Sequence, residues 1–559
     1  MEASLETVGP TRQKSLGAYY TPPELAQAVV EWAVRERADH VLDPAFGGSV
    51  FLQAAERRLR ELGCEPRSLG GQTHGCDLDE AAHEAALTDA ASDLDPARLV
   101  LSDFFLQAPG DELPRCQAVV GNPPYVRYQL SDAAAGQRAA LKAGLQTSRL
   151  SSIWAPFVAH SVQFVAPGGR LAYVLPAELL HAQYAAGVLD FVCARFSSVT
   201  VALFGRRVFP GALEEVVLLL ADGAGGECPE ATVVSFADLG ELTDRGLPRA
   251  TSGSARDASP QSPPTSARTA HDKLLSRLLP AETRELLGGL LSTSGVTPLG
   301  VLASVDIGAV TGANRFFLLA DAQAQEDGLD DGLLHEAVSK AVHVAGACLT
   351  PADIERLRAA GAPMRLLTIP RGLAPDELAT AKTTLARGLA AGVDKAYKCR
   401  VRTPWWSVPI PRHGPPDLLL TYCAAEHHRL AVNDARVLHT NTVHGVRVHP
   451  GTDARALAAS WTNSLTMLSC ELVGRSYGGG VLKLEPTEAE AVVLPPLVAD
   501  DELLITADRL VRARDLPGAL SAVDEAVLGG GLGLADEDIR LLREGAELLR
   551  ARRRGRGKA

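Results

Sequence analysis

Residues 121–125, Gly-Asn-Pro-Pro-Tyr, constrain this chain more than any other stretch. They follow the apolar run 118–120, which is typical of a buried strand that ends at a turn. Two consecutive prolines cannot continue a hydrogen-bonded ladder, so the backbone must leave the sheet there. The chain therefore holds an Asn amide, a proline carbonyl and an aromatic ring at the carboxyl end of a strand, where open α/β sheets bind their ligands.

These groups suit a flat ligand that carries an NH2 group, such as an amide or a nucleobase amine. The side-chain oxygen of Asn122 and the carbonyl of Pro123 can both accept from NH2, while the Tyr125 ring stacks beside it. With Pro124, which completes the turn, these are the candidate catalytic residues. The motif by itself is also compatible with a Pro-Pro turn that only ends a strand.

Three upstream strands are predicted, and polar or aromatic residues follow each of them. Residues 40–42 lead into the glycine turn 43–48, residues 73–77 end in Asp77, and residues 99–101 precede Asp103 and Phe104. A glycine-rich loop indicates a ligand-binding turn when it lies between a strand and a helix, as the loop at 43–48 is predicted to do. Four such strand ends in order predict a crevice along one edge of a parallel sheet with right-handed crossovers.

The first predicted helix begins near Thr21. Thr21 is the expected N-cap and Pro22 the first helical residue, and the exposed helix start suits a ligand carboxylate. A second helix is predicted from Phe51, and a third over 153–165, closed by a Pro-Gly-Gly sequence. Further strands are predicted at residues 171–176, 199–204 and 216–221.

The length of 559 residues predicts two to four domains. We expect a catalytic domain over 1–240, a flexible Ser/Pro-rich linker over 245–270, a second globular domain over 271–500, and a helical segment with a basic tail over 501–559.

The second domain contains a basic and aromatic stretch. Lys398, Arg400 and Arg402 alternate, so on a strand they share one face and can meet phosphates together. The alternative is a solvated strand with Trp405 and Trp406 in the core.

Composition sets outer limits on the function. The chain has no run of 18 apolar residues and no leader pattern, so we expect a soluble, cytoplasmic protein without a membrane partner. Nine scattered cysteines without a C-x-x-C pair indicate neither a metal site nor a disulfide framework. The net charge of −12 does not indicate a nucleic-acid-binding protein, although an acidic protein can still have a basic groove.

The ordered motifs resemble the adenine-N6-specific DNA methyltransferases of restriction–modification systems, in the γ order that places target recognition at the C-terminus. The resemblance covers roughly residues 15 to 225 by motif, and extends more loosely to about 500. It implies a class I, Rossmann-like α/β fold with a doubly wound, mostly parallel sheet and a C-terminal α+β target-recognition domain. It also implies S-adenosylmethionine as cofactor, double-stranded DNA as substrate, base flipping, and a separate restriction endonuclease or defence-system subunit as possible partner.

The resemblance assigns roles by motif position. Thr21 would hold the methionine end of the cofactor, Asp77 its ribose, and Phe209 would pack on the far side of a target base held by the 122–125 loop. The remaining residues that the resemblance places around the cofactor are Asp43, Ala45, Gly47, Asp103 and Phe104. Ser49 departs from the family, which usually has a second glycine there, and this departure bears on cofactor affinity.

Three alternatives stay open at this point. Protein-glutamine methyltransferases of release factors share the Asn-Pro-Pro-Tyr motif, although they are generally shorter and lack a long C-terminal region. A combined restriction and modification enzyme is disfavoured because only about 16 residues precede the Gly17 turn. A non-catalytic DNA-binding modification subunit is favoured only if Ser49 abolishes cofactor binding.

Overall fold

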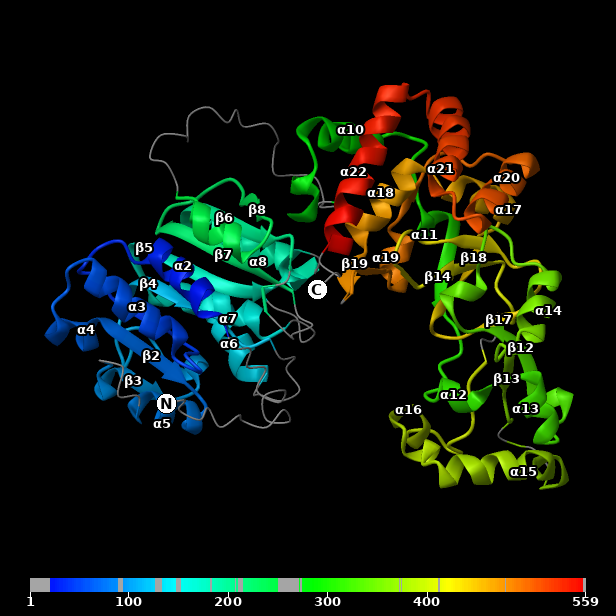
Figure 1. The fold of residues 1–559 in the computed structure, drawn as a ribbon, viewed down its shortest axis with the longest axis horizontal. Coiled ribbons are helices and arrows are strands. Elements are labelled where there is room, and N and C mark those ends of the chain that lie inside the picture. Colours follow the sequence, from blue (N-terminus) through cyan, green and yellow to red (C-terminus); the bar gives the residue numbers. More distant parts are fainter. Residues whose placement is uncertain are drawn as a thin grey trace. The chain divides into compact units, whose positions relative to one another are not determined.

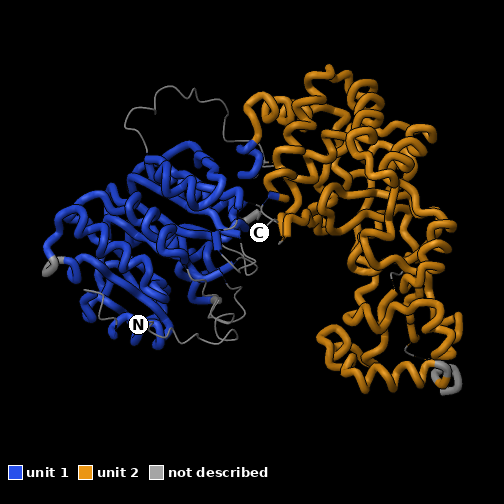
Figure 2. The backbone as a smooth tube through the Cα atoms, in the orientation of Figure 1, with its two compact units in different colours: residues 1–268, 273–278, 555–559 blue, residues 269–272, 279–554 orange. Residues whose placement is uncertain are grey.

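The computed structural model describes residues 21–88, 94–125, 133–146, 152–180, 183–206, 208–209, 215–249, 271, 274–370, 372, 375–410, 413–477 and 479–555. The chain divides into two compact units (Figure 2). Unit 1 comprises Met1–Arg268, Lys273–Leu278 and Gly555–Ala559, and unit 2 comprises Thr269–Asp272 and Leu279–Arg554.

Unit 1 is built on an eight-stranded sheet in the order β3-β2-β1-β4-β5-β7-β6-β8 (Figure 1). Its strands are β1 Val41–Asp43, β2 Thr73–Asp77, β3 Leu99–Leu101, β4 Cys116–Gly121, β5 Val165–Pro176, β6 Phe196–Phe204, β7 Val216–Ala224 and β8 Thr232–Phe236. Neighbouring strands from β3 to β5 are parallel, and β7 runs antiparallel to both β5 and β6. The expected doubly wound, mostly parallel sheet is confirmed, and β8 is a strand that the sequence reasoning missed.

The strand order reverses between β1 and β4, which are adjacent although two strands separate them in sequence. Such a reversal opens a crevice at the carboxyl ends of the strands, because the crossovers on its two sides leave in opposite directions. The residues that follow β1 and β4 therefore lie at the ligand-binding edge of the sheet.

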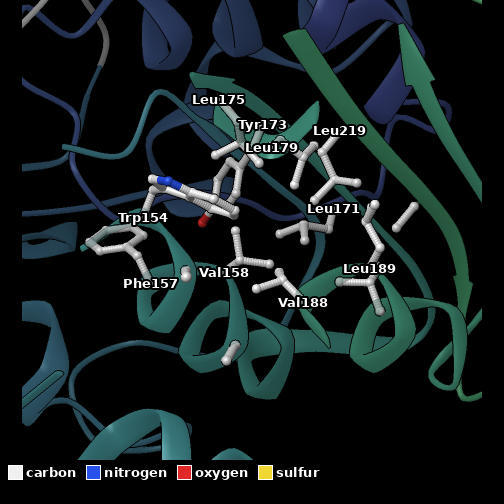
Figure 3. Close-up of a cluster of buried hydrophobic side chains, with 14 of the residues drawn as sticks. Trp154, Phe157, Val158, Leu171, Tyr173, Leu175, Leu179, Val188, Leu189 and Leu219 are labelled. Carbon is white, nitrogen blue, oxygen red and sulfur yellow. The ribbon is translucent and has the colours of Figure 1, made fainter. Parts of the chain in front are cut away.

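Helices cover both faces of this sheet. Leu171, Tyr173 and Leu175 of β5 point to the side of α7 and α8, where they pack with Trp154 and Phe157 and their neighbours (Figure 3). The alternate residues Ala172 and Val174 pack in a second cluster with α2 and α3. The helices of unit 1 are α2 Pro23–Ala33, α3 Val50–Glu61, α4 Pro66–Gln72, α5 Glu80–Thr88, α6 Ala133–Ala143, α7 Trp154–Ser161, α8 Gln183–Cys193 and α9 Leu239–Arg245.

Two local expectations for unit 1 are wrong. The N-cap of α2 is Pro22, not Thr21, whose side chain lies buried in the site described below. The third helix ends at Ser161 and gives way to the 3-10 turn η3 (Val162–Phe164), so that Val165 already starts β5. Pro167-Gly168-Gly169 lies inside that strand, where the register against β4 shifts. A Cβ at Gly169 would lie 2.8 Å from the Ala166 carbonyl oxygen and 2.9 Å from that of Gln117, so this position requires glycine.

Unit 2 is an α+β unit with small, mainly antiparallel sheets. Four strands pair in the order β10-β18-β14-β16, four as β11-β13-β12-β17, three as β15-β20-β19 and two as β21-β9. The strands are β9 Thr297–Pro298, β10 Ala303–Ile307, β11 Leu318–Leu319, β12 Leu334–Val338, β13 Arg365–Leu367, β14 Leu418–Thr421, β15 Cys423–Ala424, β16 Leu430–Val432, β17 Leu438–His439, β18 Val443–Val448, β19 Arg475–Tyr477, β20 Val481–Lys483 and β21 Val493–Leu494.

The helices of unit 2 are α10 Ala281–Leu291, α11 Leu299–Leu302, α12 Asn314–Phe317, α13 Asp321–Glu326, α14 Pro351–Ala359, α15 Pro375–Ala390, α16 Tyr397–Arg400, α17 Ala454–Trp461, α18 Ser464–Val473, α19 Pro486–Glu490, α20 Asp501–Arg512, α21 Leu516–Asp524 and α22 Asp536–Gly555, with a π-helical segment at Glu525–Gly530. Among the described helices, none combines the length and the apolarity that a bilayer crossing requires.

The predicted linker and the predicted basic tail lie partly outside the described residues. Residues 246–249 have no regular structure, and 250–270 are outside the described part. Residues 552–555 form the last turn of α22, where the buried Arg553 pairs with Glu471 (Nη2–Oε1 2.7 Å). This arginine is therefore a structural side chain of unit 2.

Candidate functional site

The site lies where β1 and β4 end side by side. Asp43 is the last residue of β1, and Gly121 is the last residue of β4, with Asn122 directly after it. Gly121 has φ of 149°, and a Cβ there would lie 2.7 Å from Asp43 Oδ1. Only glycine therefore lets the Asp43 carboxyl lie against the start of the catalytic loop.

Two hydroxyl groups hold the Asn122 amide. Its Nδ2 donates to Thr21 Oγ1 (3.1 Å), and its Oδ1 accepts from the Tyr125 hydroxyl. The same hydroxyl lies 3.1 Å from the carbonyl oxygen of Val174 in β5. The amide oxygen thus faces the tyrosine side of the loop, and Thr21, Asn122 and Tyr125 form one polar chain.

Tyr125 and Phe209 belong to the same apolar cluster. The Tyr125 side chain is partly buried and packs against this cluster, and Phe209 is one of its buried members. The structure thus brings together the two aromatic residues that the sequence paired around a target base, although their stacking on a base stays a prediction.

Asp43 is fully buried, and only one of its carboxyl oxygens has a partner. Oδ1 accepts from the Ala45 N–H (3.1 Å), while Oδ2 has no hydrogen-bond partner among the residues that the structure describes. Burial raises the pKa of the Asp43 carboxyl to about 8, the Ala45 hydrogen bond opposes this rise, and the nearby charge of Asp77 adds to it. A buried acceptor without a partner fits a ligand group that is cationic or carries N–H bonds.

Asp77 holds the glycine turn in place. Its Oδ2 accepts from the Gly47 N–H and its Oδ1 from the Asp79 N–H, each at 2.8 Å. Burial raises the pKa of Asp77, and these backbone hydrogen bonds oppose the rise. Beside Gly47 no atom lies within 4 Å of the position of a Cβ, so open space adjoins the turn. Asp77 is therefore a scaffold for the loop as well as a candidate ligand group.

At the end of β3, Asp103 and Phe104 make contacts within the protein. Asp103 caps the 3-10 turn η2 (Phe104–Leu106) through the Phe105 N–H (3.0 Å), and the Phe104 ring is 4% exposed. That ring packs against the rings of Phe157 and His160 in the core. The structure therefore places the Phe104 side chain largely among core residues, and its expected position around the cofactor stays a prediction.

Sequence reasoning passed over Leu78, which is 65% exposed directly after Asp77 at the same edge of the sheet. Large exposed apolar side chains at a ligand edge offer a packing surface for a flat ring. The signal in the sequence was an apolar residue immediately after a strand-end acid.

The basic stretch of unit 2 is not the strand that the sequence predicts. Residues Tyr397–Arg400 form the short helix α16, so Lys398, Arg400 and Arg402 do not share the face of a strand. Arg402 instead turns inward, where its Nη1 donates to the Thr311 carbonyl (2.8 Å) and its Nη2 to the Val310 carbonyl. Trp405 and Trp406 are partly buried and pack on two apolar clusters.

Two family models match this chain. The model "N-6 DNA Methylase" matches residues 1–188, and the model "Type II methyltransferase M.Eco57I, C-terminal domain" matches residues 271–528. Through its residues 1–188 the chain resembles the N-6 DNA methylase family. It is a DNA methyltransferase of restriction–modification type, and the first model covers the Asp43, Asp77 and Asn122 strand ends.

Relatives with assigned activities match along most of the chain. The type II methyltransferase M.XamI of Xanthomonas campestris pv. amaranthicola is 25% identical over 507 residues, which are 87% of this chain and 86% of that protein. The type II methyltransferase M.AccI of Acinetobacter calcoaceticus is 21% identical over 85% of this chain and 84% of its own.

One solved structure shares the fold over nearly the whole chain. The type IIL restriction–modification enzyme MmeI, solved in complex with DNA, superposes with a TM-score of 0.60 at 12% identity, over 97% of this chain and 80% of that one. At this identity the match establishes the fold alone. The expected combination of a class I methyltransferase sheet with a C-terminal α+β part is confirmed.

Proposed function

We propose that this enzyme transfers a methyl group from S-adenosylmethionine to the N6 amine of adenine in double-stranded DNA, at a specific sequence and after the base has been flipped out of the helix. The observation that carries the proposal is the Asn122 amide. It lies at the strand reversal, one residue beyond Gly121 and beside the buried Asp43. A base within a duplex cannot reach such a recessed amide, so flipping is part of the proposal.

The cofactor-binding residues would be those around the glycine turn. The Oδ2 of Asp43, without a partner among the described residues, suits the cationic groups of S-adenosylmethionine, and the open space beside Gly47, two residues after Ala45, gives room for them. Asp77 has lone pairs left for the ribose hydroxyls, and Leu78 offers an apolar surface to the adenine. When bound, the cofactor supplies a methyl group activated by a sulfonium.

The chain's own contribution to the chemistry is orientation of the amine. Adenine N6 is a poor nucleophile because its lone pair is delocalised into the ring. Asn122 Oδ1 and the Pro123 carbonyl, accepting from both N–H bonds, favour a pyramidal amine and localise that pair. Stacking against Tyr125 holds the base in line for the transfer, so positioning and hydrogen bonding carry the rate.

Unit 2 would recognise the DNA target, with residues 271–500 as its recognition region and Lys398 and Arg400 among its phosphate contacts. Both side chains are exposed. Arg402 is excluded from this role by its inward hydrogen bonds. A separate restriction endonuclease would be the partner, as in type II systems, and the site of action would be the cytoplasm, where the host DNA lies.

The decisive experiment identifies the methylated product. The purified full chain is incubated with tritiated S-adenosylmethionine and DNA from a host without adenine methylation, and the nucleosides are resolved by mass spectrometry. We expect N6-methyl-2′-deoxyadenosine, and single-molecule mapping of the product DNA then gives the recognition sequence. Methylated cytosine in the product DNA would overturn the adenine assignment. Unlabelled DNA together with label in the glutamine of a release factor, supplied in a parallel reaction, would also overturn it.

A further inference from the structure

Two exposed tyrosines stand out on unit 2 because large aromatic rings rarely remain so open. Tyr397 is 66% exposed at the start of α16, and Tyr477 is 64% exposed at the end of β19. Each has cationic groups within about 6 Å of its ring centre, but the charges of these groups are used differently.

The cations beside Tyr477 are neutralised. Lys483 Nζ lies 5.4 Å from the ring centre and pairs with Glu485 Oε1 at 2.8 Å. Arg475, two residues before Tyr477, pairs with Glu488. This hairpin therefore presents an aromatic ring with little net positive charge.

The cations beside Tyr397 remain available. Lys398 Nζ lies 5.7 Å and Arg400 Cζ 6.0 Å from the Tyr397 ring centre, and in the described part of the chain neither of them forms an ion pair. Lys395, just before the helix, and Val401, just after it, are exposed as well. We call Lys395, Tyr397, Lys398, Arg400 and Val401 the α16 ledge.

The ledge is firmly mounted on its unit. The Cys399 side chain is buried under it and, together with Arg402, contacts the Thr311 carbonyl. Gly312 has φ of 82°, and a Cβ there would lie 2.6 Å from Lys398 Cβ, so this turn can approach α16 only as glycine. Figure 1 shows α16 at the end of unit 2 remote from α20 and α21.

We infer that the α16 ledge is a DNA-contacting element in which Lys398 and Arg400 bind phosphates while the Tyr397 ring packs against a sugar or base in a groove of the duplex. Free cations that flank a rigid, exposed aromatic ring match the backbone charges and the flat faces of DNA together. Aromatic rings also lose little conformational entropy on contact. The inference rests on the proposed function, because it specifies how that function engages its substrate.

The test uses the full chain and a fluorescein-labelled duplex of mixed sequence, with affinity measured by anisotropy over a series of salt concentrations. Tyr397→Ala should weaken binding about tenfold, the scale of one lost aromatic contact, with an unchanged salt slope. Tyr397→Phe should bind like wild type. The double variant Lys398→Ala/Arg400→Ala should lower the slope of log K against log salt by about 1.8, which is about 0.9 for each lost phosphate contact.

Tyr477→Ala is the matched control, since it removes an equally exposed ring whose cations are paired, and it should leave the affinity unchanged. Cofactor binding by calorimetry should match wild type in every variant, which shows that unit 1 is intact, and an unchanged thermal unfolding transition shows the same for unit 2. Wild-type affinity and slope in the Tyr397 and Lys398/Arg400 variants, or an equal loss in Tyr477→Ala, would overturn the inference. If the wild-type chain neither binds nor methylates duplex DNA, the proposed function itself fails, and the two failures are thereby distinguished.

Discussion

At the scale of single residues, Asn122 and Tyr125 share one hydrogen bond but have separable roles. The Tyr125 hydroxyl donates to Asn122 Oδ1, the oxygen that would accept a hydrogen bond from the target amine. Asn122→Ala removes that acceptor, so we expect kcat to fall by about 10²–10³-fold, as for other lost transition-state hydrogen bonds, with cofactor binding intact. Tyr125→Phe should keep most activity because it keeps the ring face, whereas Tyr125→Ala should lose base capture.

Tritiated methyl transfer under saturating cofactor, with calorimetry for cofactor binding, measures these effects. Wild-type turnover in Asn122→Ala would remove the amide from the chemical step even if adenine is the substrate. A Tyr125→Phe enzyme as poor as Tyr125→Ala would show that the hydroxyl, and not the ring, is the important group.

Asp43 is expected to make cofactor binding dependent on pH. The pKa of Asp43 is raised from 3.8 to about 8 in the folded chain. Between about pH 4 and 8, therefore, the Asp43 carboxyl is protonated in the folded chain and ionised in the unfolded chain. This contribution to stability is complete below about pH 4 and is lost as the pH rises through 8. A bound cation favours the carboxylate, so binding near pH 7 should release about one proton, and affinity should rise toward pH 8.

Calorimetric titration of cofactor in two buffers with different ionisation enthalpies counts the released protons. Asp43→Asn keeps an acceptor for the Ala45 N–H but cannot titrate, so its proton release should fall and its pH profile should flatten relative to wild type. Equal proton release in both chains would place the titrating group elsewhere.

At the scale of elements, the start of α3 carries a strained serine. Ser49 is the N-cap residue, yet its φ of 60° and ψ of 12° are left-handed, and its side chain makes no capping hydrogen bond. A non-glycine residue in this conformation is less stable by roughly 1–2 kcal/mol. Ser49→Gly should therefore raise the free energy of unfolding by about 1 kcal/mol, after the added chain entropy of glycine is subtracted.

Urea unfolding measures the Ser49 effect, and Ser49→Ala is the control because it keeps the Cβ that causes the strain. Ser49→Gly should also bind cofactor at least as tightly as wild type, since the glycine turn keeps its hydrogen bond to Asp77. A gain in stability that is equal in Ser49→Ala would mean that the hydroxyl, rather than the backbone, is unfavourable.

The elements also show which parts of the fold were predictable. The 99–101 strand was predicted from its run of three apolar residues, although β3 leaves Leu101 exposed at the edge of the sheet. The 73–77 strand, Thr-His-Gly-Cys-Asp, has little apolar character and was predicted to end at its acid, and its first four residues are buried. The predicted strand at Lys398 to Arg402 was wrong because alternating charges indicate a strand only if the intervening residues are buried. Cys399 is buried there, but Val401 is exposed, and the segment has no partner strand.

At the scale of the whole molecule, the site was predictable where it depends on strand order and not where it depends on packing. Turn residues after β1 and β4 could be assigned to one edge because parallel strands end together. The burial of Phe104 and the exposure of Leu78 depend on which helix covers each strand end. The residue pattern of a single strand does not indicate which helix packs over its end.

The buried histidines of unit 2 predict acid sensitivity of the molecule. His428 is fully buried, with Nδ1 2.6 Å from the Thr421 carbonyl and no partner at Nε2. Burial, opposed by that hydrogen bond and assisted by the charge of Arg553, lowers the pKa of His428 to about 3, and burial lowers the pKa of its neighbour His427 to about 4. Both therefore stay neutral in the folded chain at pH values where the unfolded chain binds protons.

Since the unfolded histidines titrate near 6.5, stability is complete above that pH and falls as the pH drops toward the folded values, by up to about 1.4 kcal/mol per pH unit for each histidine. Calorimetric melting between pH 7.5 and 5 should show a falling transition temperature. His428→Gln cannot bind the proton, so its transition should fall less steeply even if it starts lower. The exposed His413, replaced by Gln, should leave the slope unchanged. An unaltered slope in His428→Gln would assign the acid sensitivity to other groups, because the linkage depends only on protons bound differently by the folded and unfolded chains.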